Sequence, residues 1–316
     1  MSTGESAISF REVGKSYGDF RAVEGLSFNV APGSIYGFLG PNGAGKTTSL
    51  RMMLGMIAPS TGEISVLGSP SAMGVRERVG YLPEERGLYR RMTPLETIVY
   101  LARLKGMDAA PARKKALELL ERFGLAAFAK SRIEALSKGM AQKVQILATI
   151  VHAPDLVILD EPFSGLDPVN QQVLEELVED LRREGRTVLF STHVMQHAER
   201  LCDRLLLIAR GKLAFEGTLD EARDRMPQTI KLTTSADAAD LAALPGVVKV
   251  AADPVHAGSY ELTMKNGADG ENLLRSCFER GLQLTGFDMS EPALHDIFVA
   301  LVGEGAEVAD SRGTAP

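Results

Sequence analysis

Cysteine is scarce in this sequence, with two residues in 316, Cys202 and Cys277. Neither belongs to a Cys-x-x-Cys or a Cys/His cluster, so we predict neither a disulfide framework nor a structural zinc site. Long hydrophobic runs are also missing. The longest apolar runs are short, for example residues 205–209, whereas a helix that crosses a bilayer needs about 20 apolar residues. The N-terminus shows no basic stretch followed by an apolar one, so no signal peptide is expected. Any membrane role should therefore be peripheral.

A surplus of positive charge is missing as well. The chain carries 35 Lys and Arg against 41 Asp and Glu, a formal net charge of −6. Proteins that bind nucleic acid in general are usually basic, so we expect no nucleic-acid partner. The 45% hydrophobic and 24% charged residues are ordinary for globular protein, and the length suits about two domains.

Strands and helices alternate through the first two thirds of the chain, which is typical of an α/β domain. The composition changes near Met226 and Pro227, after which strands and helices follow a nearly ferredoxin-like order with one helix added. We predict a first domain at residues 1–225 with a mostly helical subdomain at 86–152, a small α+β domain at 226–303 and a flexible tail at 304–316.

A glycine-rich segment stands between an apolar strand and a helix. Residues 40–47 match G-x-x-x-x-G-K-[S/T], a phosphate-binding loop, and the flanking strand and helix disfavour a chance match. Glycines let backbone N–H groups surround phosphate oxygens, and the helix start adds its positive dipole end. Lys46 should reach the β- and γ-phosphates, and Thr47 should offer its hydroxyl to Mg²⁺. The predicted binding residues are Gly40, Pro41, Asn42, Gly43, Ala44, Gly45, Lys46, Thr47 and Thr48.

Two adjacent acids, Asp160 and Glu161, end an apolar strand that starts at Leu156. Ligands of open parallel sheets bind at the carboxyl ends of strands. We expect Asp160 to hold Mg²⁺ and Glu161 to act as general base on the attacking water. Acids in this position also cap helices, so the catalytic interpretation depends on the phosphate loop being present.

Further motifs follow in an order that resembles the ATP-binding cassette (ABC) family over residues 6–225. L-S-K-G-M at 136–140 stands where the family has its L-S-G-G-Q signature, and S-G-L-D at 164–167 where it has its D-loop. S-T-H at 191–193 stands in the place of the switch histidine. The resemblance implies a P-loop NTPase cassette with a RecA-like core, an antiparallel β subdomain and a helical subdomain, followed here by the ferredoxin-like domain.

The resemblance also implies roles for single residues around ATP. Tyr17 would stack on adenine, and His193 would donate to the γ-phosphate and orient the water, with Lys46 and Glu161 completing the catalytic set. A strand-edge packing role is the alternative for Tyr17.

Other family positions imply a dimer. Ser137 and Gly139 would contact the nucleotide of an opposite subunit, and Asp167 would act across the same interface. A helix N-cap is an alternative or additional role for Ser137. Two chains would then enclose two MgATP, with a homodimer favoured over a heterodimer with a related cassette.

Three positions depart from the family pattern. Glu84 replaces the usual glutamine of the Q-loop; it can still bind nucleotide and approach Mg²⁺, but it adds negative charge beside phosphates. Lys138 and Met140 replace a glycine and a glutamine of the signature. Lys138 would add positive charge near the nucleotide or remain solvated. These departures resemble the subgroup that drives small exporters of the sodium-efflux and drug-resistance type, whose C-terminal extension ends in a segment similar to residues 291–298.

The implied function is an ATPase subunit of an ABC exporter, bound to a separate transmembrane permease and located in the cytoplasm on the inner face of the cell membrane. Residues 88–104 are expected to dock on the permease, with a buried amphipathic face as the equal alternative. A soluble ABC ATPase acting on ribosomes or DNA is the second hypothesis, disfavoured by the single cassette, the absence of sustained heptads and the acidic charge. A non-catalytic ATP-gated module is disfavoured because Glu161 and His193 are present.

Overall fold

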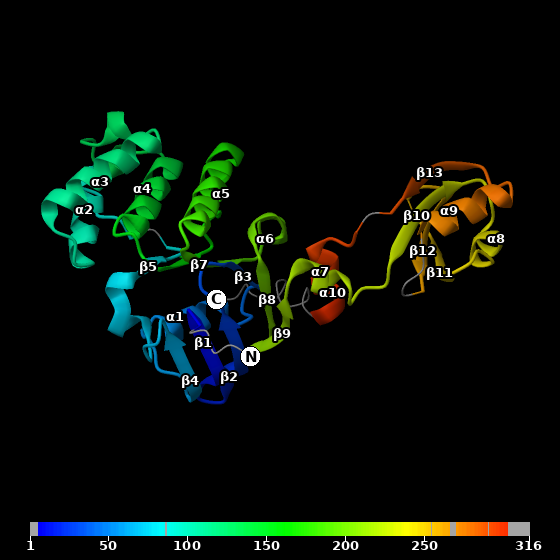
Figure 1. Cartoon of the computed structure of the whole chain (residues 1–316), viewed down its shortest axis with the longest axis horizontal. Helices are drawn as coiled ribbons and strands as arrows, with labels where there is room; N and C mark the ends of the chain where they lie inside the picture. The colour runs from blue at the N-terminus through cyan, green and yellow to red at the C-terminus, as the bar shows by residue number, and fades with distance from the viewer. Residues whose placement is uncertain (1–5, 86, 254, 266–269, 290, 303–316) are drawn as a thin grey trace, which may run out of the picture. The chain divides into compact units, whose positions relative to one another are not determined.

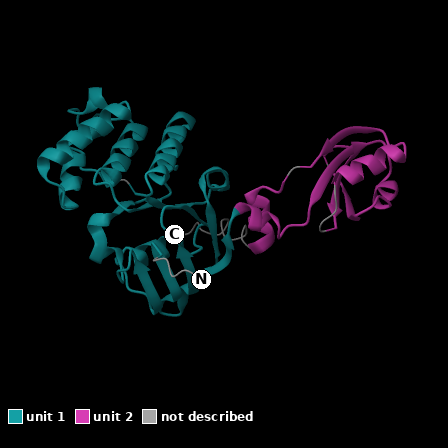
Figure 2. Cartoon of the chain, viewed as in Figure 1, with its two compact units in different colours: residues 1–218 teal, residues 219–316 magenta. Residues whose placement is uncertain are grey.

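The computed structural model describes residues 6–85, 87–253, 255–265, 270–289 and 291–302. The chain divides into two compact units, residues 1–218 and 219–316 (Figure 2). The domain bounds proposed from the sequence place this division slightly later, after residue 225, and they stay a prediction. The proposed tail at 304–316 lies outside the described residues. No helix in the described ranges is both long and apolar enough to cross a membrane.

A central sheet organises the first unit. Its strands are β3 Ile35–Leu39, β5 Val79–Leu82, β6 Leu156–Asp160, β7 Thr187–Thr192, β8 Arg204–Ala209 and β9 Lys212–Gly217. They run in the order β5-β6-β7-β3-β8-β9, and only β9 is antiparallel to its neighbour. Every residue of β3, β6 and β7 is buried, as expected for parallel strands covered on both faces. Helices α1 Lys46–Met53, α5 Pro168–Arg183 and α6 Met195–Leu201 follow strands of this sheet.

A second, antiparallel sheet lies in the same unit (Figure 1). It consists of β1 Ile8–Tyr17, β2 Phe20–Val30 and β4 Thr61–Val66, in the order β2-β1-β4. Phe28 of β2 stacks on Phe10 at 4.5 Å between ring centroids and meets Phe38 of the central sheet at 6.1 Å. The two sheets therefore share one core, to which α1 contributes Leu50, Met52 and Met53.

Three helices between β5 and β6 pack on one another (Figure 1). They are α2 Pro94–Leu104, α3 Ala109–Arg122 and α4 Lys138–Ile150. The short 3-10 helices η2 Ala126–Phe128 and η3 Ile133–Ala135 lie between α3 and α4, and a third, η1 Ala72–Arg78, precedes β5. Thr93 starts α2 with a capping box: Glu96 N–H donates to Thr93 Oγ1 at 3.2 Å, and Thr93 N–H donates to the Glu96 carboxylate at 2.9 Å. This cap fixes the start of the helical segment.

The second unit contains a four-stranded antiparallel sheet. Its elements are α7 Leu219–Arg223, β10 Thr229–Thr234, α8 Ala238–Ala242, β11 Val247–Ala252, β12 Ser259–Met264, α9 Gly270–Glu279, β13 Leu284–Asp288 and α10 Leu294–Val302. The strand order is β11-β12-β10-β13, the ferredoxin-like order expected from the sequence. Leu241 of α8 and Leu273 of α9 join Leu232 of β10 in a separate core, so these helices cover one face of the sheet.

Candidate nucleotide-binding and catalytic site

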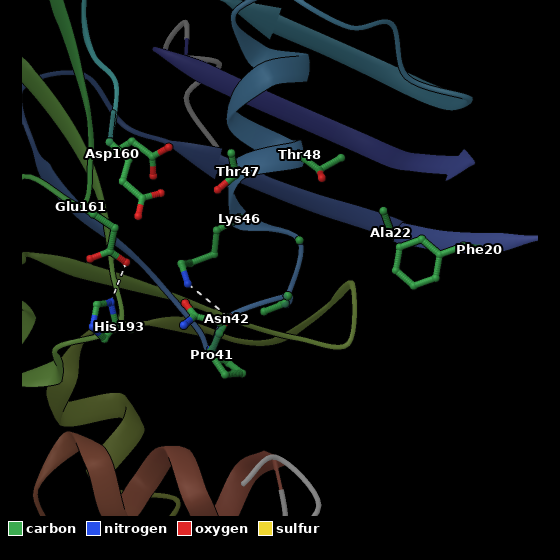
Figure 3. Close-up of a pocket in the computed structure, with 14 residues that line it drawn as sticks. Phe20, Ala22, Pro41, Asn42, Lys46, Thr47, Thr48, Asp160, Glu161 and His193 are labelled. Carbon is green, nitrogen blue, oxygen red and sulfur yellow. Dashed lines mark hydrogen bonds and ion pairs between the residues drawn. The ribbon is translucent and has the colours of Figure 1, made fainter. Parts of the chain in front are cut away.

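Neighbouring strands of the central sheet bring the sequence motifs to one edge. The phosphate loop follows β3, the paired acids end β6, and His193 follows β7; β7 pairs with both β3 and β6. A cavity of about 390 Å³ opens there. It is lined by loop residues 41–48, Glu84, Asp160, Glu161 and His193, together with Phe20 and Ala22 (Figure 3).

The loop in front of α1 adopts a backbone that requires glycine. Gly45 has φ +105°, and a Cβ there would lie 2.7 Å from the carbonyl oxygen of Ala22. A Cβ on Gly40 would lie 2.3 Å from the carbonyl oxygen of Ile208. No side chain caps the start of α1, so its first N–H groups are left for an anion.

Lys46 lies in this loop with 7% of its surface exposed. Its Nζ donates to the carbonyl oxygen of Gly40 at 2.6 Å and to that of Pro41 at 3.2 Å, the second of which is marked in Figure 3. Burial lowers the pKa of Lys46, and the nearby carboxylates, Glu161 first, oppose that shift. Lys46 is thus held by weak neutral acceptors of its own loop, and a phosphate would be a stronger partner.

The two acids at the end of β6 differ in their surroundings. Asp160 is 3% exposed and accepts a short hydrogen bond from Ser191 Oγ. Burial raises the pKa of Asp160, the hydrogen bond from Ser191 lowers it, and the carboxylates of Glu84 and Glu161 raise it further. Glu161 instead turns toward His193, whose Nδ1 lies 2.9 Å from Glu161 Oε1 (Figure 3). The pair matches a general base with an orienting histidine.

These residues fit Mg²⁺. Thr47 and Asp160 both line the cavity and supply hard oxygen ligands, and three carboxylates face one lysine. No group of three or more His, Cys, Asp or Glu side chains arranged for a metal occurs within the described ranges. Mg²⁺ usually takes one or two protein ligands and completes its shell with phosphates and water, so the Thr47 hydroxyl and the Asp160 carboxylate would be sufficient protein ligands. The roles given to Thr47, Asp160 and Glu84 at the metal stay predictions.

Phe20 is an aromatic lining residue that sequence reasoning missed. It lies with Ala22 at the end of the cavity away from Glu161 and His193 (Figure 3). Tyr17, expected to stack on adenine, is not among the lining residues; it pairs in register with Phe20 across the β1–β2 turn, with Lys15 Nζ 5.2 Å from its ring centroid. An aromatic residue three positions after Tyr17 was the available signal.

Ser137, Gly139 and Asp167 lie outside the lining of this cavity. Ser137 caps α4 by accepting the N–H of Met140 at 3.2 Å, and Asp167 caps α5 by accepting the N–H of Asn170 at 2.9 Å. This hydrogen bond lowers the pKa of Asp167. The N-cap expected as one role of Ser137 is therefore present, and contacts of all three with a second chain's nucleotide stay a prediction.

Two of the departures from the family motifs share a neighbouring cavity of about 420 Å³. Glu84 and Lys138 both line it, beside Asp160 and Glu161. Lys138 replaces glycine and Glu84 replaces glutamine, so the added positive and negative charges lie in one place. We predict that the positive charge of Lys138 partly offsets the added carboxylate of Glu84 next to the phosphate site.

Comparisons with known proteins agree with this geometry. The family model "ABC transporter" matches residues 23–164, and "ATP-binding protein DrrA1-3-like, C-terminal domain" matches residues 217–302. YhaQ of Bacillus subtilis (strain 168), named as an ABC transporter ATP-binding protein, is 39% identical over 94% of this chain and 98% of its own length. Nod factor export ATP-binding protein I of Paraburkholderia xenovorans (strain LB400) is 44% identical over 67% of this chain and 71% of its own.

Solved structures point the same way. An ATP-binding subunit of an ABC transporter superposes with a TM-score of 0.65 at 33% identity, covering 69% of this chain and 92% of its own. The cbiO1 protein from Clostridium perfringens, described as part of the ABC transporter complex cbiONQ, gives 0.63 at 25% identity, covering 70% and 92%. The chain belongs to the family of ABC transporter ATP-binding proteins. The resemblance drawn from the ordered motifs and the predicted fold class are confirmed.

Replacing Phe20 with alanine should weaken ATP binding. Loss of a base–aromatic contact costs about 1–3 kcal/mol, so we expect an increase in Kd of about fivefold or more. Fluorescence titration with a labelled ATP analogue measures it, with Y17A as the comparison. An F20A chain that binds like the wild type, beside a Y17A chain that does not, would assign the base to Tyr17 alone.

Glu84 and Lys138 should be energetically coupled. K138G should weaken ATP binding because the carboxylates lose a counter-charge, by about fivefold for a coupling of about 1 kcal/mol. In an E84Q background the same change should stay within about twofold. ATP titration of the wild type, K138G, E84Q and E84Q/K138G tests this coupling, with K138R as a control that keeps the charge. An equal loss of ATP affinity on K138G in both backgrounds contradicts the coupling.

Proposed function

We propose that this chain hydrolyses MgATP as the motor subunit of an ABC exporter and transmits the energy to a separate transmembrane permease. The observation that carries the proposal is the cavity that joins Lys46, Asp160, Glu161 and His193 at one sheet edge. The export direction is supported by the similarity to Nod factor export ATP-binding protein I. The chain would act at the cytoplasmic face of the membrane, through its permease.

The geometry supports a direct sequence of events at the γ-phosphate. Loop N–H groups and the start of α1 bind the phosphates, and Lys46 moves from the carbonyls of its own loop to the γ-phosphate. Thr47 and Asp160 would hold Mg²⁺, which when bound would supply positive charge beside the phosphates. Glu161 takes the proton of the attacking water, the bond between the β–γ bridging oxygen and the γ-phosphorus breaks, and ADP and phosphate form. His193 keeps Glu161 oriented through the 2.9 Å contact.

A dimer completes the proposed mechanism. Ser137 and Gly139 lie at the start of α4, where helix N–H groups favour an anion such as the γ-phosphate held by a second chain. Asp167, at the start of α5, would act at the same interface. We propose a homodimer around two MgATP, because this chain carries every catalytic residue itself.

An exposed apolar surface on the helical segment is the proposed permease contact. Tyr100 and Leu104 lie one turn apart on α2 and are 41% and 57% exposed. Tyr89, 55% exposed, meets Tyr100 edge to face at 5.8 Å between ring centroids. Exposed large apolar side chains that touch one another mark an interaction surface more strongly than isolated ones do. They fall within the 88–104 segment expected to dock.

Affinity purification of the tagged chain from detergent-solubilised native membranes tests the proposal. We expect a polytopic membrane protein in stoichiometric amount with the wild-type chain. The Y100E/L104E variant should lose it because charge is placed in an apolar contact. L117E, which changes a 43% exposed leucine on α3, should retain it. ATP affinity of all chains serves as the folding control. Recovery of ribosomal proteins or DNA-repair factors alone would contradict the transporter role and favour the soluble alternative.

A further inference from the structure

Glu161 has an unfavourable backbone conformation. Its φ is +47°, in the left-handed region that is unfavourable for a residue with a side chain. Such a conformation persists only where the surroundings impose it. The backbone N–H of Glu161 is held by β7: it donates to the carbonyl oxygen of Ser191 at 3.1 Å and lies 3.2 Å from the Oγ of Ser191. The direction of the Glu161 side chain therefore depends on what holds the residues that follow it.

The next two residues are held by other elements. The carbonyl oxygen of Pro162 accepts a 2.7 Å hydrogen bond from Nε2 of Gln142, a buried residue of α4. Phe163 is 4% exposed, and its ring meets Phe190 of β7 edge to face at 5.7 Å between centroids. Three consecutive residues, from Glu161 to Phe163, are thus fixed to both β7 and α4.

The Phe163 ring also contacts a histidine. The imidazole of His197, on α6, stacks on Phe163 at 4.0 Å between centroids with an interplanar angle of 12°. His197 is 5% exposed, and its Nδ1 lies 3.0 Å from the carboxylate of Glu175 on α5. Arg200 also pairs with Glu175, so this carboxylate is neutralised independently of the histidine. Glu175 of α5 therefore holds the imidazole ring of His197 nearly parallel to the ring of Phe163.

We propose that His197 is a positioning residue for hydrolysis, which acts through its stack on Phe163 to aim Glu161 at the attacking water. The segment after β6 meets the segment after β7 at two points. At one, Glu161 contacts His193; two residues later, Phe163 stacks on His197, four residues beyond His193. Two contacts fix the orientation of the segment after β6 relative to the segment after β7. With the Glu161–His193 contact alone, the two segments could still rotate about that contact.

This inference rests on the proposed role of Glu161 as general base. The competing explanation is that His197 only fills space in the core. The two differ in what must be preserved: positioning through the stack requires a flat ring at 197, while the hydrogen bond to Glu175 serves only to orient that ring. Removing the ring should then slow the chemical step and leave ATP binding intact.

Three variants of the full chain separate these explanations. H197F keeps the ring and loses the hydrogen bond, and H197Q keeps a polar partner for Glu175 and loses the ring. Q196A alters the exposed neighbour on the same helix as a control. Phosphate release at varied ATP gives kcat and KM, and thermal unfolding reports stability.

We expect H197Q to lower kcat about tenfold, since small misplacements of a catalytic group have effects of this size or larger, with KM within about twofold. H197F should keep more than half of the wild-type kcat, and Q196A should match the wild type. A wild-type kcat in H197Q, equal losses in H197F and H197Q, or a loss explained by unfolding would each overturn the inference. Absence of phosphate release from the wild-type chain would instead overturn the proposed function.

Discussion

The whole site depends on the parallel pairing of β6, β7 and β3. In register, Leu39 at the end of β3 pairs with Thr192 of β7, and Asp160 at the end of β6 pairs with Ser191. Strands β3, β6 and β7, which are far apart in the sequence, therefore end at the same edge of the sheet, and the motif residues that follow them lie close together. Complete burial of these strands makes a register shift costly, because each inward side chain would change faces. The geometry of the proposed catalytic site is thus a consequence of the sheet core.

Electrostatics gives this edge its affinity for a charged ligand. Asp160 and Lys46 are buried, and burial shifts the pKa of both toward the uncharged form. The carboxylates around them are incompletely balanced by one lysine, Lys46, whose Nζ donates a hydrogen bond to the carbonyl oxygen of Gly40. A divalent cation and a polyphosphate supply both missing charges together. Lys138, which replaces a glycine of the signature, lines the same neighbouring cavity as Glu84, and we predict that it offsets the extra carboxylate.

Much of this arrangement could be predicted from the sequence, because the phosphate loop and the paired acids are local patterns. The loop needs glycine at position 45 for its φ, and a run of apolar residues before Asp160 indicates a buried strand. The βαββαβ order of the second unit was readable for the same reason. These features depend on neighbours in the chain.

Other features depend on side chains that meet only after folding. Phe20 lines the cavity in addition to the expected loop, whereas the family resemblance pointed to Tyr17, three positions earlier. Glu84 and Lys138 were each recognisable as departures, but their shared cavity arises from the packing of α4 beside β5. The stack of His197 on Phe163 likewise joins two elements whose contact no local pattern encodes. Sequence patterns therefore indicated the motif residues of the site, whereas the contacts that surround these residues became visible only in the folded structure.

The most direct measurement is ATP-dependent phosphate release by the purified wild-type chain and by E161Q, alongside ATP binding to each. The account predicts Mg²⁺-dependent release by the wild type and loss of steady-state turnover in E161Q with ATP binding retained, because glutamine keeps the shape of the side chain and removes the base. Equal turnover in both chains would contradict the assignment of Glu161 and, with it, the catalytic site described for this sheet edge.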